Sequence, residues 1–168
     1  MKKRHFLQKI SLGLGVLPVL GFTPSAGKTS SPKNLLPAAL KKGDLVGLIS
    51  PSAATADLMQ FTFAKEAMEG LGLKVIEGKH LKNRRGHLAG TDEERAADLN
   101  EMFANKAVKA IICIRGGSGA ARILPLIDYK TVKNNPKPLL GYSDITALHN
   151  ALFAQTGLIT FHGPNGSG

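Results

Sequence analysis

A serine on a turn between a strand and a helix is the residue of this chain best placed to do chemistry. Ser143 follows the apolar residues 138–140 and precedes an apolar-periodic segment over residues 147–154. The α/β hydrolases present a nucleophile on such a turn, although this motif lacks the second glycine of the G-x-S-x-G pattern. The alternative is a plain helix cap, in which Ser143 and Asp144 accept from free N–H groups of the helix.

A serine nucleophile needs a base to take its proton and N–H donors to hold the oxyanion. The N–H of Asp144 is one natural donor, and a glycine N–H from Gly116 or Gly117 could be the second. His162 could approach the same edge of the sheet as a base, whereas His149 lies too far along the expected helix. These residues offer a nucleophile and its donors, but no clear base.

The glycine-rich residues 115–119 (RGGSG) follow a buried strand and could cradle a phosphate. They lack the Walker lysine and do not meet G-x-G-x-x-G, so a tight strand-to-helix turn is the alternative. The single cysteine, Cys113, lies in an apolar run and is expected in the core. The sequence carries no H-x-x-E-H or C-x-x-C spacing, and we expect neither a metal nor a cofactor.

The elements that must position these residues alternate between short apolar strands and helices. A capping box of Thr91 and Glu94 opens one helix. This alternation predicts an α/β fold of the flavodoxin or Rossmann-like kind, with a parallel sheet covered by helices on both faces. Loops 50–52, 115–119 and 142–144 should then meet at the carboxyl ends of the strands. We expect strands at 44–50, 74–77, 109–114, 138–140 and 158–161, and helices at 56–71, 91–104, 120–126 and from the Ser143 turn to about 155.

Length and charge restrict the class of protein. At 168 residues there is room for one domain with its own core. The formal charge of +10 includes five basic and no acidic residues within residues 1–30, so the remainder carries only +5. Because its basic residues are scattered rather than aligned on one face, we expect no nucleic-acid partner.

Residues 1–27 are typical of an export signal. Basic residues 2–4 are followed by the apolar residues 10–22 and by small residues at 24–27. The segment resembles a twin-arginine signal with Lys3 in place of the first arginine, and a Sec signal is the alternative. We expect export to the periplasm or cell envelope, a linker over 28–39, and no membrane span after cleavage. An N-terminal helix in a cytoplasmic protein is the competing interpretation.

Five segments in this order resemble the LD-carboxypeptidase family, which comprises serine peptidases of murein tetrapeptides related to the microcin-immunity peptidases. The resemblance covers roughly residues 40–164. Ser118 stands where the family commonly has tyrosine. The matching segments are 49–52 (ISPS), 88–99 (LAGTDEERAADL), 115–122 (RGGSGAAR), 141–146 (GYSDIT) and 162–164 (HGP).

The resemblance implies that residues 40–164 form the N-terminal, nucleophile-bearing domain. It implies that Ser143 is the nucleophile and that the backbone N–H groups of Gly117 and Asp144 form the oxyanion hole. The family's catalytic glutamate and histidine belong to a C-terminal domain, to which residues 165–168 would begin the passage. We therefore expect the 168-residue chain alone to be inactive. The expected substrate-binding residues are Ser50, Arg115, Gly116 and Ser118.

The reaction implied by the resemblance is hydrolysis of the bond between an L-configured centre and the terminal D-alanine of murein tetrapeptide. One alternative is a microcin-immunity-type serine peptidase that cleaves a peptidyl-nucleotide. Another, of a different class, is a non-catalytic α/β domain that binds a small ligand and uses Ser143 only as a helix cap. By the same resemblance, the whole protein is expected to form a homodimer.

Overall fold

A parallel sheet of five strands forms the centre of the computed structural model, which describes residues 33–166. The strands lie in the order β2-β1-β3-β4-β5, and all four pairings are parallel. This arrangement confirms the predicted α/β class. The strands are β1 (Leu45–Ile49), β2 (Lys74–Glu77), β3 (Val108–Cys113), β4 (Leu139–Gly141) and β5 (Phe161–His162).

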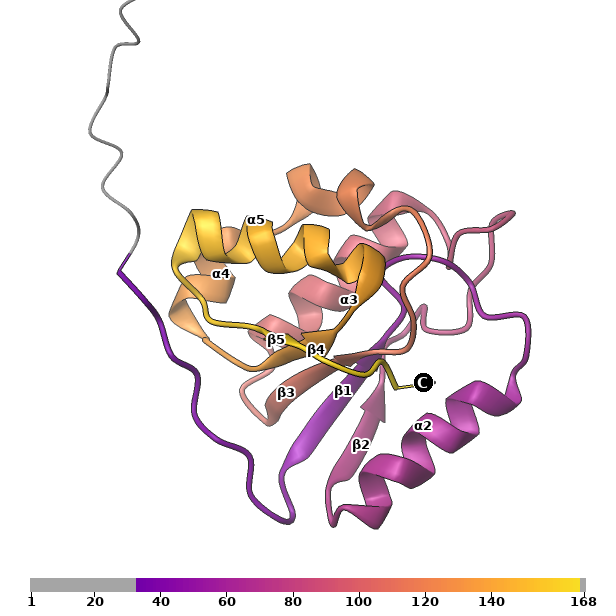
Figure 1. Ribbon diagram of the computed structural model, residues 1–168, viewed down its shortest axis with the longest axis horizontal. Coiled ribbons are helices and arrows are strands. Elements are labelled where there is room, and N and C mark those ends of the chain that lie inside the picture. Colours follow the sequence, from indigo (N-terminus) through magenta and orange to yellow (C-terminus); the bar gives the residue numbers. More distant parts are fainter. Residues whose placement is uncertain (1–32, 167–168) are drawn as a thin grey trace, which may run out of the picture. The chain divides into compact units, whose positions relative to one another are not determined.

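Helices cover both faces of the sheet, as the alternating pattern predicts. Figure 1 shows α2 on one face and α3, α4 and α5 on the other. The capping box is present, since Glu94 N–H donates to the Thr91 hydroxyl and the Glu94 carboxylate accepts from Thr91 N–H. The helices are α2 (Met59–Gly70), α3 (Asp92–Ala104), α4 (Tyr129–Asn134) and α5 (Thr146–Thr156), with 3₁₀ turns η1 (Ala120–Leu126) and η2 (Ser143–Ile145).

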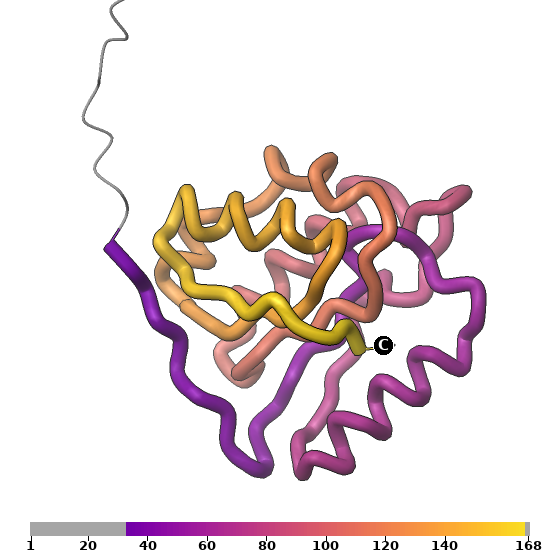
Figure 2. The backbone as a smooth tube through the Cα atoms, viewed as in Figure 1, coloured from indigo at the N-terminus to yellow at the C-terminus, as the bar shows by residue number. Residues whose placement is uncertain are grey.

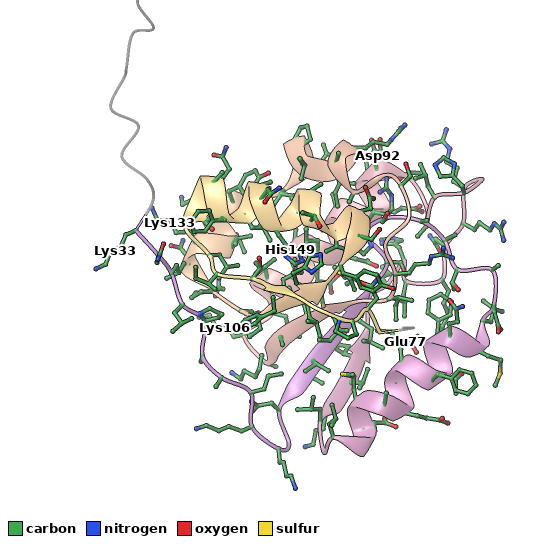
Figure 3. All side chains as sticks on the ribbon, in the orientation of Figure 1. Lys33, Glu77, Asp92, Lys106, Lys133 and His149 are labelled. Carbon is green, nitrogen blue, oxygen red and sulfur yellow. The ribbon has the colours of Figure 1, made fainter. Side chains whose placement is uncertain are left out.

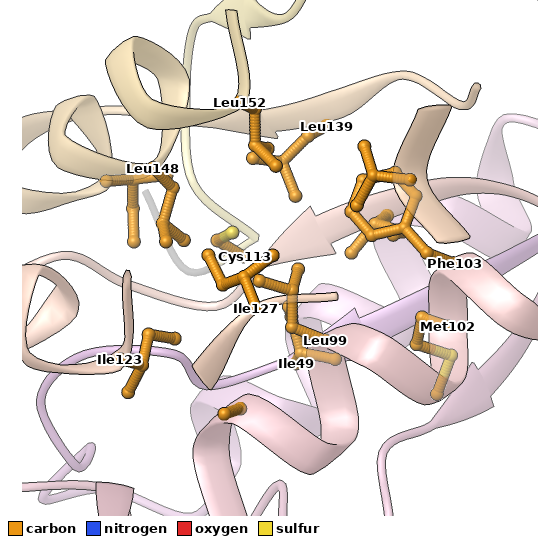
Figure 4. Packing of buried hydrophobic residues seen from close by; sticks show 14 of the residues in the cluster. Ile49, Leu99, Met102, Phe103, Cys113, Ile123, Ile127, Leu139, Leu148 and Leu152 are labelled. Atoms are coloured by element: carbon orange, nitrogen blue, oxygen red, sulfur yellow. The ribbon is translucent and has the colours of Figure 1, made fainter. Parts of the chain in front are cut away.

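The larger hydrophobic core lies between the sheet and the face that carries α3, α4 and α5 (Figure 4). Leu99 and Phe103 of α3 pack there with Leu148 and Leu152 of α5. Cys113 is fully buried in the same cluster, and burial raises the pKa of its thiol, which therefore stays protonated. This placement confirms its predicted role as a core residue.

The smaller core lies under α2, where Phe61 and Ala64 pack on Val46, Leu48 and Ile112 of the sheet. The chain after β5 returns beside this region, as the tube in Figure 2 shows. Its end is fixed by a bond from Gly166 N–H to Cys113 O at 2.9 Å. The described residues up to Gly166 are therefore packed on the domain.

Three details differ from the sequence-based expectations. Helix α4 was not anticipated; the Asp128 side chain opens it by accepting from Thr131 N–H at 3.0 Å. Strand β5 lies at residues 161–162, because Leu158 instead forms an isolated bridge with Leu35. That bridge uses Leu35, within the predicted linker 28–39, so the contacts of the domain begin before residue 40.

The predicted export signal, residues 1–27, lies outside the described residues. Within residues 33–166, no helix combines the length and the apolar character that crossing a membrane requires.

Candidate active site

Three loops meet at the carboxyl ends of β1, β3 and β4. The Ser52 hydroxyl donates to the carboxylate of Asp144, and Ala53 N–H donates to Gly116 O at 3.3 Å. A Cβ added at Gly116 would lie 3.0 Å from Cβ of Ser143, so the glycine loop packs directly against the serine turn. The convergence that the parallel topology predicts is confirmed.

Ser143 has a backbone conformation that side chains rarely adopt. Its φ of 62° makes it the one non-glycine residue with positive φ among residues 33–166. Such a conformation costs about 1–3 kcal/mol and is concentrated at functional sites. The side chain is exposed, and its hydroxyl has no hydrogen-bond partner within the described part of the chain. The turn therefore holds Ser143 in a strained backbone conformation that exposes a free hydroxyl.

The helix-cap interpretation of this turn is wrong. Tyr142 and Ile145 occupy the N-cap positions of η2 and α5, and neither has a side-chain cap. The carboxylate of Asp144 points to other elements, where it accepts from Ser52 and from Ala120 N–H. The side chains of Ser143 and Asp144 thus do not accept from the free N–H groups at the start of their own helix.

The expected oxyanion donors are available. Gly117 has φ 113°, and a Cβ there would lie 2.5 Å from Cβ of Ala53, so the position requires glycine. Across residues 33–166, the N–H groups of Gly117 and Asp144 find no acceptor. Free N–H groups beside an exposed hydroxyl are the arrangement that stabilises a developing oxyanion.

A pocket of about 380 Å³ opens at the serine turn. It brings together Ser143 with Gly117 and with two of the predicted substrate-binding residues, Arg115 and Gly116. Arg115 supplies a positive charge and is held by a bond from Nη1 to Ala54 O at 3.3 Å. The residues that line the pocket are Gln60, Arg115, Gly116, Gly117, Tyr142, Ser143 and Asn165.

The other two predicted substrate-binding residues are not brought to this pocket. Ser50 is 4% exposed and its hydroxyl is buried without a partner among the described residues. It faces the interior because β1 ends within the core. Ser118 is exposed, but it does not line the pocket.

Two residues of the pocket were missed by sequence reasoning. Asn165 is buried, and its Oδ1 accepts from Tyr142 N–H at 3.0 Å, which ties the chain after β5 to the serine turn. Residue 165 therefore belongs to the site. Gln60 reaches the pocket from α2 and bonds the Thr55 hydroxyl. No local motif marks either residue, because only packing between distant segments brings them here.

The two nearby histidines do not pair with Ser143. His149 points from α5 toward β4 (Figure 3), where its Nε2 donates to Gly141 O at 2.9 Å. Burial lowers the pKa of His149, which favours the neutral ring of a packed core histidine. The exposed His162 ring stacks edge-on with Tyr142 at 6.4 Å between centroids. Residues 33–166 thus place no base on the nucleophile.

The described residues contain no cluster of three or more His, Cys, Asp or Glu side chains suited to hold a metal ion. Within this part of the chain, the chemistry of the site rests on Ser143, Arg115 and the backbone N–H groups.

Known proteins are similar to this chain in sequence and in fold. A model of the LD-carboxypeptidase N-terminal domain matches residues 46–163. A probable murein peptide carboxypeptidase of Bacillus subtilis is 51% identical over 131 residues, covering 78% of this chain and 41% of its own length. The microcin C7 self-immunity protein MccF of Escherichia coli is 38% identical over 132 residues, covering 77% and 38%.

Solved structures agree with this likeness. An MccF-like protein of Bacillus anthracis has a TM-score of 0.76 at 37% identity, with 79% of this chain and 41% of that protein covered. The chain thus spans about 40% of the length of the relatives it matches.

Proposed function

The chain belongs to the LD-carboxypeptidase family, and we propose that it bears the nucleophile of a serine carboxypeptidase. In the whole protein, the enzyme hydrolyses the bond between an L-configured centre and the terminal D-alanine of murein tetrapeptide. The similarity to a probable murein peptide carboxypeptidase supports this substrate class. The positive charge of Arg115 at the pocket suits the terminal carboxylate of such a peptide.

The observation that carries the proposal is the hydroxyl of Ser143, which has no partner and lies beside two free N–H groups on a strained backbone. Ser143 Oγ loses its proton to a base and attacks the carbonyl carbon of the scissile bond. The carbonyl oxygen becomes an oxyanion that accepts from the N–H groups of Gly117 and Asp144. Collapse of this intermediate transfers the proton to the leaving amine, releases D-alanine and leaves an acyl-serine, which water then hydrolyses.

The described residues 33–166 place no base on Ser143, so we propose that another segment of the protein supplies it. The family resemblance assigns it to a histidine that a glutamate orients, both in a C-terminal domain. Neither His149, which bonds Gly141 O, nor His162, which stacks on Tyr142, substitutes for that histidine. We accordingly propose that the 168-residue chain alone gives no turnover.

A second candidate activity is cleavage of a peptidyl-nucleotide by the same serine. It is favoured by the likeness to MccF, for which a structure in complex with aspartyl sulfamoyl adenosine has a TM-score of 0.75 at 37% identity. Both candidates use the same nucleophile and oxyanion hole, so the difference between them lies in the groups that bind the rest of the substrate.

The decisive experiment measures D-alanine release from murein tetrapeptide by the whole protein and its Ser143→Ala variant. We expect kcat to fall by at least about 10³-fold, because nothing else in the pocket can form the acyl intermediate. Thr62→Ala is the matched control, because it removes an exposed hydroxyl of α2 outside the pocket, and it should retain activity. Wild-type activity in Ser143→Ala would exclude the nucleophile role, and hydrolysis of only a peptidyl-nucleotide would favour the second candidate.

We also propose that residues 1–27 direct export, since basic, apolar and small residues occur there in the order of a signal peptide. Fractionation of cells that produce the whole protein should recover it from the periplasm or envelope, with an N-terminus near residue 28. Recovery of the uncut protein in the cytoplasm would contradict this proposal.

A further inference from the structure

One peptide group beside the oxyanion hole is held from both sides by charged side chains. The carbonyl of Gly119 accepts from Nη1 of Arg95 at 2.9 Å. The N–H of the same peptide group, which belongs to Ala120, donates to Oδ2 of Asp144 at 2.8 Å. The carbonyl of this peptide group thus bonds a positive side chain and its N–H bonds a negative one. Such charge-assisted hydrogen bonds are stronger than bonds between neutral groups. We call this arrangement the Gly119–Ala120 clamp.

The clamp acts on a loop that has little stiffness of its own. Gly117 and Gly119 both have positive φ, at 113° and 129°, so glycine is required at positions that also permit many other conformations. The exposed Ser118 between them makes no hydrogen bond within residues 33–166. External anchors must therefore fix the direction in which the Gly117 N–H points.

Both ends of the clamp also hold the loop after β1. Arg95 Nη1 donates to Pro51 O at 2.7 Å, and the next residue, Ser52, donates its hydroxyl to Asp144. Arg95 is 1% exposed, so its bonds form away from competing water. The clamp therefore links the glycine loop, the loop after β1 and the serine turn into one unit.

The serine turn itself supplies one end of the clamp. The backbone N–H of Asp144 is one proposed oxyanion donor, while its carboxylate reaches across to the loop that carries the other, Gly117. The spacing of the two donors is consequently set by a side chain that need not touch the substrate. This gives Asp144 a second role beyond its backbone donor.

We propose that Arg95 and the Asp144 carboxylate are positioning residues that set the distance between the Gly117 and Asp144 N–H groups. The proposal rests on the function proposed above, in which these groups bind the oxyanion. Misplaced donors stabilise the oxyanion of the transition state less, while they hardly affect the binding of the substrate in its ground state. Disruption of the clamp should therefore lower kcat and leave KM almost unchanged.

The first test is kinetic and uses the whole protein. Asp144→Ala keeps the backbone donor but removes the carboxylate, and we expect kcat to fall about 10- to 100-fold with KM within about threefold. Asp144→Asn retains one acceptor oxygen and should recover part of the loss. Asp128→Ala, which removes a capping carboxylate of α4 remote from the pocket, is the matched control and should retain kcat.

Arg95→Lys tests the other end of the clamp. A lysine keeps the charge, but it lacks the guanidinium geometry in which Nη1 bonds both Pro51 O and Gly119 O while Nη2 stays on Asp92. We expect a similar loss of kcat, whereas Arg122→Lys should have none, because the Arg122 side chain is exposed and pairs with Asp92 outside the clamp. An unchanged kcat in both Asp144→Ala and Arg95→Lys, or a rise in KM alone, would overturn the proposal.

The second test does not depend on activity. Residue-resolved amide hydrogen exchange should show the Ala120 N–H exchanging at least about tenfold faster in Asp144→Ala than in the wild type or in Asp128→Ala. Unchanged exchange at Ala120 would rule out the clamp even if kcat fell. A wild-type protein that releases no D-alanine contradicts the proposed function, whereas the exchange rates still decide the clamp.

Discussion

Helix α3 has a buried cation at each end, and the two ends use their cations differently. At the carboxyl end, the ammonium of Lys137 donates to the carbonyls of Met102, Phe103 and Asn105. At the amino end, the guanidinium of Arg95 donates to Pro51 O and Gly119 O, which belong to two other segments of the chain. One cation completes a helix, and the other joins loops to it.

The helix dipole makes this difference informative. A positive charge is favourable at a helix C-terminus, where unpaired carbonyls gather, and unfavourable at an N-terminus. Lys137 thus stands where helix stability alone would put it, and Arg95 does not. Asp92 in the first turn offsets the charge of Arg95 by an ion pair. The position of Arg95 is therefore explained by the loops of the site rather than by the helix that carries it.

Removal of Arg95 should have the largest effect on folding. Arg95→Met leaves Pro51 O without its donor and Asp92 without its buried partner, and we expect the free energy of unfolding to fall by about 3–5 kcal/mol. Denaturant unfolding measures the change. The matched control is Arg122→Met, which removes the exposed partner of the same aspartate and should leave the unfolding midpoint unchanged. If Arg95→Met lowers the free energy of unfolding no more than this control does, Arg95 does not join the loops to the amino end of α3 as we propose.

Removal of Lys137 should affect folding but not catalysis. Lys137→Met keeps the length of the side chain and removes the ammonium donor of Met102 O and Phe103 O at the α3 terminus, so we expect a loss of about 1–3 kcal/mol. The kcat of the whole protein, measured per folded molecule, should stay within about twofold of wild type. A tenfold loss of kcat in this variant would show that the amino edge of the sheet also supports the site.

The capping box tests whether the amino end of α3 depends on local bonds as well as on Arg95. Thr91→Ala removes the hydroxyl that accepts from Glu94 N–H, and the expected loss is about 1 kcal/mol by thermal or denaturant unfolding. Thr146→Ala, at the exposed start of α5 where no side chain caps the helix, should cost less. Equal losses in the two variants would mean that the cap contributes nothing specific.

Local signals in the sequence were sufficient for much of this structure. The capping box, the first four strands and Gly141 before the serine each depend on neighbouring residues, and each is found close to where the pattern predicts. The order of the strands then follows from their parallel pairing, which brings the loops after β1, β3 and β4 together. Ser143 and the glycine loop 115–119 could be placed in one site on these grounds.

The rest of the site depends on contacts between residues far apart in the chain. In the sequence, Arg95 looks like an ordinary charged residue of a helix. Its burial is explained only by the carbonyls of two other loops, to which it donates. Asp144 reads as a helix cap, yet its carboxylate serves another turn. Asn165 has no motif at all. Side-chain direction across loops is not encoded in spacing, so these roles required the three-dimensional structure.

A pH series separates the two cations, because an arginine stays protonated over the range in which a buried lysine titrates. Burial lowers the pKa of Lys137 to about 8, and the nearby charge of Lys109 adds to the effect. In the unfolded chain the same group titrates near 10.5. Between these values the unfolded chain retains a proton that the folded protein has released, so stability rises with pH.

We therefore expect the wild type to gain stability relative to Lys137→Met between pH 8 and 10.5, with a constant difference below pH 8. The difference between the wild type and Arg95→Met should stay constant over the same range, since no lysine is changed. Denaturant unfolding at a series of pH values measures both differences. Parallel profiles for the wild type and Lys137→Met would mean that the three carbonyls hold the ammonium protonated against the cost of its burial, and the two ends of α3 would then be electrostatically alike.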